Sequence, residues 1–135
     1  MCISVATIAH AQVKKMVSYT SSRYNHPVVM DVYEYDYVDV QPEFPGGERE
    51  LIKYINTERK YPEQAYANNI QGRVLCSFVV NSDGSISHIS ILRGVEESLN
   101  KEAMRIVASM PKWTAGKINN TTVPVRCIIP IAFRR

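Results

Sequence analysis

Three cysteines and three histidines are the residues of this sequence best suited to catalysis or metal binding. Cys2, Cys76 and Cys127 form no C-x-x-C motif, which is the spacing typical of metal and redox sites. A thiol acts as a nucleophile when an imidazole lies within hydrogen-bonding reach. Cys76 and His88 are the pair to test for this chemistry, because they lie on neighbouring strands of a predicted hairpin.

This hairpin is predicted for residues 71–94, where apolar and polar side chains alternate along both arms. Such alternation is the period of a strand that buries one face. Asp83-Gly84 between the arms suits a two-residue turn, in which the backbone needs positive φ. Folding at this turn pairs Phe78 with Ile89, so that the large side chains of the buried face meet apolar partners.

The same register separates the two candidate catalytic residues. Cys76 pairs with Ile91 on the buried face, whereas His88 lies opposite Val79 on the other face. The thiol and the imidazole therefore cannot meet without disruption of the core. We interpret Cys76 and Cys127 as small hydrophobic side chains on buried strand faces, and the alternative is a disulfide.

No other pattern of catalytic or cofactor-binding residues is found in the sequence. It contains no phosphate-binding loop, no H-E-x-x-H and no G-x-S-x-G motif. Residues 27–43 carry five acids and no bases, and residues 44–135 carry 13 bases and 8 acids. This mild, scattered positive charge does not indicate a nucleic-acid partner. We therefore predict a protein that is not an enzyme and has no cofactor and no metal site.

The first 41 residues differ in composition from the rest. Residues 1–11 are apolar and uncharged and end in an A-x-A pattern just before Gln12, so we interpret them as the remnant of a secretory signal peptide. The alternative is an apolar terminus without this role. Residues 12–41 are predicted to form a linker or an extended acidic arm, which either docks on the basic remainder or stays a solvated tether. No apolar run approaches the roughly 20 residues that cross a bilayer.

Residues 42–135 are predicted to form one α+β domain. Apolar residues recur at helical spacing in residues 48–56 and 98–110, and Pro62 suits the first turn of a shorter helix. A last strand is expected at residues 123–133, where apolar and polar side chains alternate again.

The proline positions and the long helix predict the topology. Pro124 and Pro130 lie in the last strand, and proline cannot donate to a ladder, so this strand is predicted to be an edge strand. The helix returns the chain and leaves the first hairpin arm in the centre. The expected fold is a three-stranded antiparallel sheet, in the order second arm, first arm, last strand, with helices packed on one face.

A series of short motifs runs through residues 42–135 in a fixed order. They are Pro42-Glu43-Phe44-Pro45-Gly46-Gly47, Tyr61-Pro62-Glu63-Gln64-Ala65, Ile70-Gln71-Gly72-Arg73-Val74, Asp83-Gly84-Ser85-Ile86, Leu92-Arg93-Gly94-Val95, Met110-Pro111-Lys112-Trp113, Gly116-Lys117 and Val123-Pro124-Val125. Together they resemble the C-terminal domain of TonB-type energy transducers, in the version common in Bacteroidetes. No single motif is decisive, but the series is highly specific.

The resemblance implies a fold, a location and a partner. The implied fold is a three-stranded antiparallel sheet on helices, and the implied location is the periplasm. Family members carry force from a proton-driven inner-membrane motor to outer-membrane receptors for siderophores, cobalamin or glycans, and the receptor's TonB-box peptide adds as a strand beside the last strand. Carried onto this sequence, the contact residues are Lys60, Tyr61, Pro62, Val123, Val125, Arg126, Cys127, Ile128, Ile129, Ile131 and Phe133.

Two departures from the family pattern limit what the resemblance implies about force transfer and about the contact residues. Full transducers have an N-terminal membrane helix and a proline-rich spacer that this sequence lacks, so motor proteins would be reached through a separate chain. Lys60 is not the residue type expected at its contact position. One alternative is a structural or regulatory interaction domain of the envelope, such as a homodimer through exposed strand edges. Another is a self-capped form, in which residues 31–40 pair with the last strand and block it.

Overall fold

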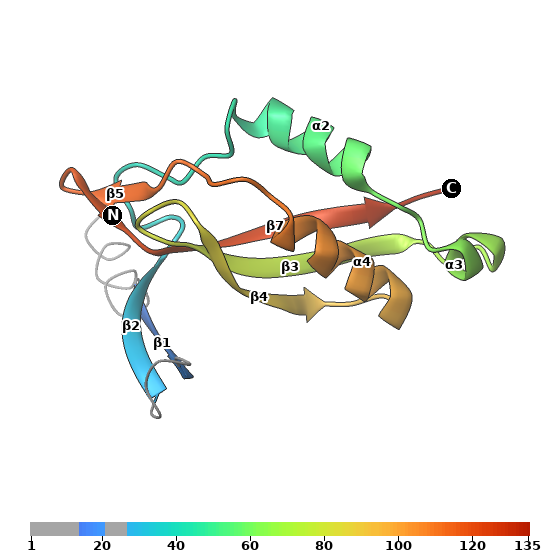
Figure 1. Cartoon of the computed structure of the whole chain (residues 1–135), viewed down its shortest axis with the longest axis horizontal. Helices are drawn as coiled ribbons and strands as arrows, with labels where there is room; N and C mark the ends of the chain where they lie inside the picture. Colours follow the sequence, from blue (N-terminus) through green and yellow to red (C-terminus); the bar gives the residue numbers. More distant parts are fainter. Residues whose placement is uncertain (1–13, 21–26) are drawn as a thin grey trace, which may run out of the picture.

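The computed structural model describes residues 14–20 and 27–135, and it describes side chains from residue 31 onward. The predicted signal-peptide remnant at residues 1–11 lies outside this part of the chain. In chain order the elements are β1 (Lys14–Thr20), β2 (Pro27–Glu34), α2 (Glu48–Glu58), α3 (Glu63–Ala67), β3 (Gly72–Val80), β4 (Ile86–Arg93), α4 (Glu97–Ala108), β5 (Gly116–Ile118), β6 (Thr121–Val123) and β7 (Val125–Phe133) (Figure 1).

The main sheet has the strand order β1-β2-β7-β3-β4. β3 pairs antiparallel with both β4 and β7, which confirms the α+β class and the predicted order of these strands. The sheet has five strands instead of three, because β1 and β2 form a hairpin and β2 pairs with β7. Figure 1 shows this hairpin projecting away from the other strands, with the end of β2 close to the start of β7.

The turn between β3 and β4 is longer than the predicted two-residue turn. Asn81 N donates to Ser85 O at 2.8 Å, and Gly84 N donates to Asn81 O at 2.8 Å. Gly84 has a φ of 89°, in the left-handed region that glycine tolerates. A turn that ends in such a glycine is the usual three-residue hairpin loop. The Asp83-Gly84 signal therefore located the turn correctly and predicted its length wrongly.

The longer turn shifts the first pairs of the hairpin by one residue. Val79 lies opposite Ser87, not opposite His88 as predicted. Further along, His88 and Ile89 together oppose Phe78, and His88 has a φ of 53°. One extra residue on one strand is a β-bulge. The simple cross-strand pair predicted for Phe78 and Ile89 is therefore wrong.

The bulge cancels the shift for the next two pairs, and a second shift beyond Cys76 places Leu75 opposite Arg93. Ser77 lies opposite Ser90, and the predicted pair of Cys76 and Ile91 is confirmed. The apolar side of β3 thus meets the apolar side of β4 despite the longer turn.

The hydrophobic core lies between the helices and one face of the sheet. It combines residues of three helices with alternate residues of β3 and β7. Its fully buried members include Val74, Cys76, Phe78, Val80, Leu99, Ala103, Ile106, Val107, Ile131 and Phe133. The N-cap of α4 is Glu96, whose carboxylate accepts a hydrogen bond from Ser98 N at 3.1 Å. No helix in the described part of the chain is both long and apolar enough to span a membrane.

The segment after α4 is clamped onto the β3–β4 loop. Trp113 N donates to Gly84 O at 2.9 Å, and a Cβ on Gly84 would lie 2.1 Å from Trp113 O. The Trp113 ring packs edge-on against Phe44 and Phe78, with centroid distances of 5.7 and 5.4 Å. These contacts fix the β3–β4 loop against the segment that follows α4.

The predicted connector before the last strand contains a second, smaller hairpin of β5 and β6. Its turn is Asn119-Asn120, with φ of 51° and 67°, as a two-residue hairpin turn requires. Asp39 and Val40 are held against it, because both donate backbone hydrogen bonds to Lys117 O, at 2.9 and 3.1 Å. The acidic segment is therefore docked on the domain and does not remain a solvated tether.

Candidate functional site

The last strand, β7, presents alternate side chains to two different environments. Its odd-numbered residues face the helices and are at most 9% exposed: Val125, Cys127, Ile129, Ile131 and Phe133. Its even-numbered residues lie on the opposite face, where Ile128 is 50% exposed. Five of the predicted contact residues therefore have side chains that are buried in the folded protein.

The backbone groups of β7 alternate in the same way. Tyr33 N donates to Pro124 O at 3.0 Å, so the even-numbered positions direct their backbone groups toward the outer edge of the sheet. The odd-numbered positions face β3, with which β7 is paired along its whole length. The outer edge is therefore formed by the backbone of Arg126, Ile128, Pro130 and Ala132.

Pro130 and Ala132 are two edge residues that the sequence-based list of contact residues lacks. Both follow from the period-two alternation once one outward-facing residue is known, but no sequence signal indicated which set faces outward. Pro130 lies opposite Leu75 of β3 and has no N–H to lose on the outer side. Its position in the strand therefore does not interrupt the pairing with β3.

The start of this edge is covered by β2. β2 runs parallel to β7, with Tyr33 beside Val125 and Glu34 beside Arg126. The prediction that the last strand is an edge strand is thus wrong at its first two residues. From residue 127 onward no strand of the described chain lies on the outer side of β7. A parallel contact of two residue pairs leaves no periodic pattern in the sequence, which is why it was not predicted.

Arg126 lies on the sheet face opposite the helices, beside the buried residues Ser77 and Val79, at the point where β2 ends. Its Nε donates to Ser77 Oγ at 3.3 Å, and its Nη1 lies 3.8 Å from Glu34 Oε2. The side chains of Arg126 and Glu34 are 24% and 30% exposed. The cation is therefore held between β3 and the end of β2 and remains reachable from solvent.

Tyr61 lies at the far end of the edge. Its ring packs edge-on against Phe133, with centroids 5.6 Å apart, and its hydroxyl donates to Ile70 O. The Tyr66 ring packs edge-on against Tyr61, with centroids 5.2 Å apart, and the guanidinium of Arg135 lies 4.6 Å from the centroid of Tyr66. Tyr61 therefore lies beside the end of the predicted contact strand, at Phe133, and not beside its start.

Lys60 and Pro62, the other predicted contact residues in this region, have mainly structural contacts. Lys60 N donates to Glu102 Oε2 at 2.8 Å, which ties the backbone to α4, and Pro62 caps α3. Burial raises the pKa of Glu102, but hydrogen bonds from Arg105 and from Lys60 N outweigh this effect and hold the pKa below its usual value. The Lys60 side chain is exposed.

Val123 is placed outside the last strand. It belongs to β6 and pairs with Gly116 of β5. Pro124 separates it from β7 because proline ends the ladder. The predicted strand of residues 123–133 is therefore two elements, and Val123 is not on the candidate edge.

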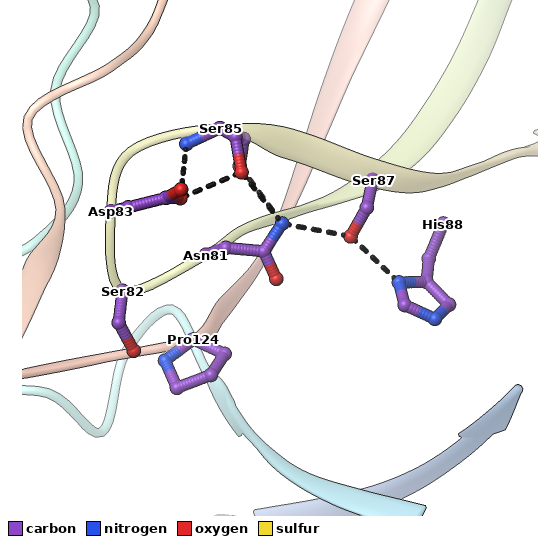
Figure 2. A pocket seen from close by; sticks show the side chains of 7 residues that line it. All are labelled: Asn81, Ser82, Asp83, Ser85, Ser87, His88 and Pro124. Atoms are coloured by element: carbon purple, nitrogen blue, oxygen red, sulfur yellow. Dashed lines mark hydrogen bonds between the residues drawn. The ribbon is translucent and has the colours of Figure 1, made fainter. Parts of the chain in front are cut away.

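The Cys–His pair is not brought together. Cys76 is fully buried in the core, and burial raises the pKa of its thiol to about 11. His88 instead lines an open hollow at the β3–β4 loop, formed by Asn81, Ser82, Asp83, Ser85, Ser87, His88 and Pro124 (Figure 2).

The polar groups of this hollow bond mainly to one another. Ser87 Oγ lies 2.7 Å from His88 Nδ1 and accepts a hydrogen bond from Asn81 Nδ2 at 3.0 Å. Asp83 Oδ1 accepts hydrogen bonds from the Oγ and N of Ser85, which hold the pKa of Asp83 below its usual value (Figure 2). These bonds stabilise the loop. Among the described residues no three His, Cys, Asp or Glu side chains gather as metal ligands.

Comparison with known proteins decides the family. The family model described as Gram-negative bacterial TonB protein C-terminal matches residues 57–134. The chain belongs to the TonB C-terminal family. The resemblance predicted from the motif series is therefore confirmed.

Relatives and a solved structure agree with this family assignment. TonB proteins from two strains of Helicobacter pylori are 32% identical over 94 residues, which cover 66% of this chain and 32% of the relative. The chain thus spans about a third of the length of the curated relatives it matches. The solution structure of the H. pylori TonB C-terminal domain matches with a TM-score of 0.50 and 28% identity, over 67% of this chain and 86% of that chain.

Proposed function

We propose that this chain binds an extended peptide by strand addition at the outer edge of β7. In this proposal the peptide is the TonB-box segment of an outer-membrane receptor, and binding takes place in the periplasm during energy-coupled transport. The observation that carries the proposal is the edge at residues 128–132, beside which no strand of the described chain lies.

An edge of this kind offers a peptide both affinity and selectivity. The outward backbone groups of Ile128 and Ala132 provide donors and acceptors for a new ladder, which is the usual source of affinity in strand addition. The half-exposed side chain of Ile128 lies on the open face, where an apolar residue of the peptide can pack beside it. Tyr61, packed on Phe133, lies where such a peptide would leave the strand.

The two buried thiols favour a binding role over catalysis. Burial raises the pKa of Cys76 to about 11 and that of Cys127 to about 12. The reactive form of cysteine is the thiolate, which both raised pKa values disfavour at neutral pH. We therefore assign no catalytic step to this chain.

The test is an NMR titration of the ¹⁵N-labelled full chain with synthetic peptides from the N-termini of the TonB-dependent receptors of its host. The proposal expects saturable shifts concentrated at residues 127–133 and around Tyr61. A folded monomer that shows no saturable shift with any of these peptides would overturn it. A peptide-independent fall in the diffusion coefficient with protein concentration would instead support the homodimer alternative.

A pair of variants tests the backbone contact itself. Ile128→Pro removes one outward N–H and leaves the ladder with β3 intact, because the backbone of Ile128 faces the outer edge. Ile128→Ala removes the side chain and keeps the N–H. We expect Ile128→Pro to bind the peptide about tenfold more weakly than Ile128→Ala, as the loss of one main-chain hydrogen bond implies. Equal affinities would place the peptide elsewhere.

A further inference from the structure

The end of β2 occupies the place that an added strand would take at the start of the β7 edge. We propose that a partner peptide displaces this end from β7 and that a carboxylate of the peptide replaces Glu34 beside Arg126. This inference rests on the proposed function and adds to it the chemistry of the partner. The partner is then an extended peptide with an aspartate or glutamate in register with Arg126.

The first argument is the length of the edge that remains uncovered. β2 covers Arg126 at one end, and Pro130 offers a carbonyl but no N–H in the middle. The uncovered edge therefore has only two backbone donors, those of Ile128 and Ala132. The next outward donor and acceptor belong to Arg126, so a peptide that extends its ladder must take the position of β2.

The second argument is that the covering contact is small and local. It spans two residue pairs and includes the hydrogen bond from Tyr33 N to Pro124 O at 3.0 Å and an ion pair between partly exposed side chains. An ion pair that solvent reaches on both partners contributes little to stability. Tyr33 and Glu34 do not belong to the core cluster, so their detachment leaves that cluster in place, while Val32 before them is fully buried and keeps its position.

The third argument is that the displaced end stays close to β7. Val40 is paired with Lys117, and Asp39 Oδ2 accepts a hydrogen bond from Asn119 N at 2.7 Å. Only a few residues separate these anchors from Glu34, so the end of β2 remains at a high effective concentration near Arg126. It therefore acts as a competitor within the chain and lowers the apparent affinity for the peptide.

The fourth argument is the chemistry of Arg126. Its Nε is bonded to Ser77 of the neighbouring strand, which fixes the guanidinium on the open face. Its Nη1 points toward the carboxylate of Glu34 at 3.8 Å, a distance that leaves room for a closer partner. Glu34 thus shows which group a strand at this edge must carry to pair with Arg126.

The first experiment compares Tyr33→Pro with Tyr33→Ala in the full chain. Tyr33 N faces β7, so the proline removes the bond to Pro124 and leaves the ladder with β1 intact, while both variants lose the stacking on Tyr37. We expect Tyr33→Pro to bind a receptor-derived peptide about threefold to tenfold more tightly than Tyr33→Ala. Equal or weaker binding would overturn the displacement.

The second experiment uses the unaltered protein and follows hydrogen exchange at the Tyr33 amide. Displacement predicts faster exchange when the chain is saturated with peptide. If the shifts at Ile128 saturate while exchange at Tyr33 stays unchanged, this inference is wrong and the proposed function stands. If no peptide causes shifts at Ile128, the proposed function itself fails.

The third experiment tests the carboxylate with peptides that carry either glutamate or glutamine at the position in register with Arg126. We expect the glutamate peptide to bind several-fold more tightly to the unaltered chain, as a gained ion pair implies. The preference should vanish in Arg126→Gln and persist in Arg134→Gln, an exposed arginine just beyond β7 that serves as the matched control. A preference that survives in Arg126→Gln would contradict the pairing.

Discussion

The inner face and the outer edge of β7 are built from alternate residues of one strand, yet they have different roles. Ile131 and Phe133 are fully buried and contribute to the core, whereas Ile128 is half exposed and its backbone faces away from β3. The comparison teaches that, on this strand, odd positions determine stability and even positions determine what can be added to the sheet. The following predictions test that division.

The largest effect is expected on the inner face. Phe133→Ala removes a fully buried ring that packs against Tyr61. We expect a loss of about 3–5 kcal/mol in the free energy of unfolding, because the change combines lost burial with a cavity. Urea denaturation followed by circular dichroism would measure it. A loss below about 1 kcal/mol would show that the inner face is not the core of the domain.

A smaller loss is expected at the β3–β4 loop, which is bonded to Trp113 through Gly84. Gly84→Ala forces a side chain into a φ of 89° and toward Trp113 O, 2.1 Å from the added Cβ. We expect about 2–3 kcal/mol of destabilisation in the same denaturation assay. Gly47→Ala is the matched control, since its φ is 90° but the nearest atom, Glu43 Oε2, is 3.6 Å away. If both variants lose the same stability, the clamp with Trp113 contributes nothing.

The buried thiols predict a loss of stability at alkaline pH. Burial raises the pKa of Cys76 to about 11 and that of Cys127 to about 12, above the ordinary value of 9.0. The unfolded chain therefore releases these protons first, so the stabilisation is complete below pH 9 and is lost as the pH rises toward 11–12. At pH 10 the loss should be about 1 kcal/mol for each thiol.

Chemical denaturation at a series of pH values would measure this loss. Cys127→Ala should show a shallower decline above pH 9 than the unaltered protein, whatever its stability at neutral pH. Parallel declines for the two proteins would contradict the assignment to this thiol.

The smallest effect on stability is expected at the outer edge. Ile128→Ala changes a side chain that is 50% exposed, so the free energy of unfolding should change by less than about 0.5 kcal/mol. The same variant should weaken peptide binding, because the apolar contact on the open face is lost. A large loss of stability in Ile128→Ala would contradict the view that only the odd positions of β7 determine stability.

Much of the fold was predictable because it depends on periodic patterns. The alternation along β3, β4 and β7 predicted these strands, and the proline positions with the long helix predicted that β3 lies between β4 and β7 and runs antiparallel to both. The predicted pair of Cys76 and Ile91 is correct even though the turn was mispredicted, because the bulge at His88 restores the register. Burial of one face allows a single register in most of the sheet, and the chain absorbs the extra loop residue locally.

The candidate site was predictable only in part. The motif series located it on the last strand, but it included five residues whose side chains are in the core and did not include Pro130 and Ala132. It also included Val123, which belongs to β6. Parity along a strand shows which residues share a face, but the direction of the backbone groups depends on which neighbour pairs on each side.

The amino-acid sequence by itself determined the helices, the strands β3, β4 and most of β7 with their apolar faces, and the family, since each of these depends on residue types at short, regular spacing. The contact between β2 and β7, the tilt of Arg126 toward Ser77 and Glu34, and the length of uncovered edge were decided by tertiary structure alone. The two residue pairs and the ion pair join the end of β2 to the start of β7, and the bond from Arg126 to Ser77 joins residues 49 positions apart. Contacts so few and so distant leave no repeated pattern in a sequence, because no hydrophobic face of their own has to be buried.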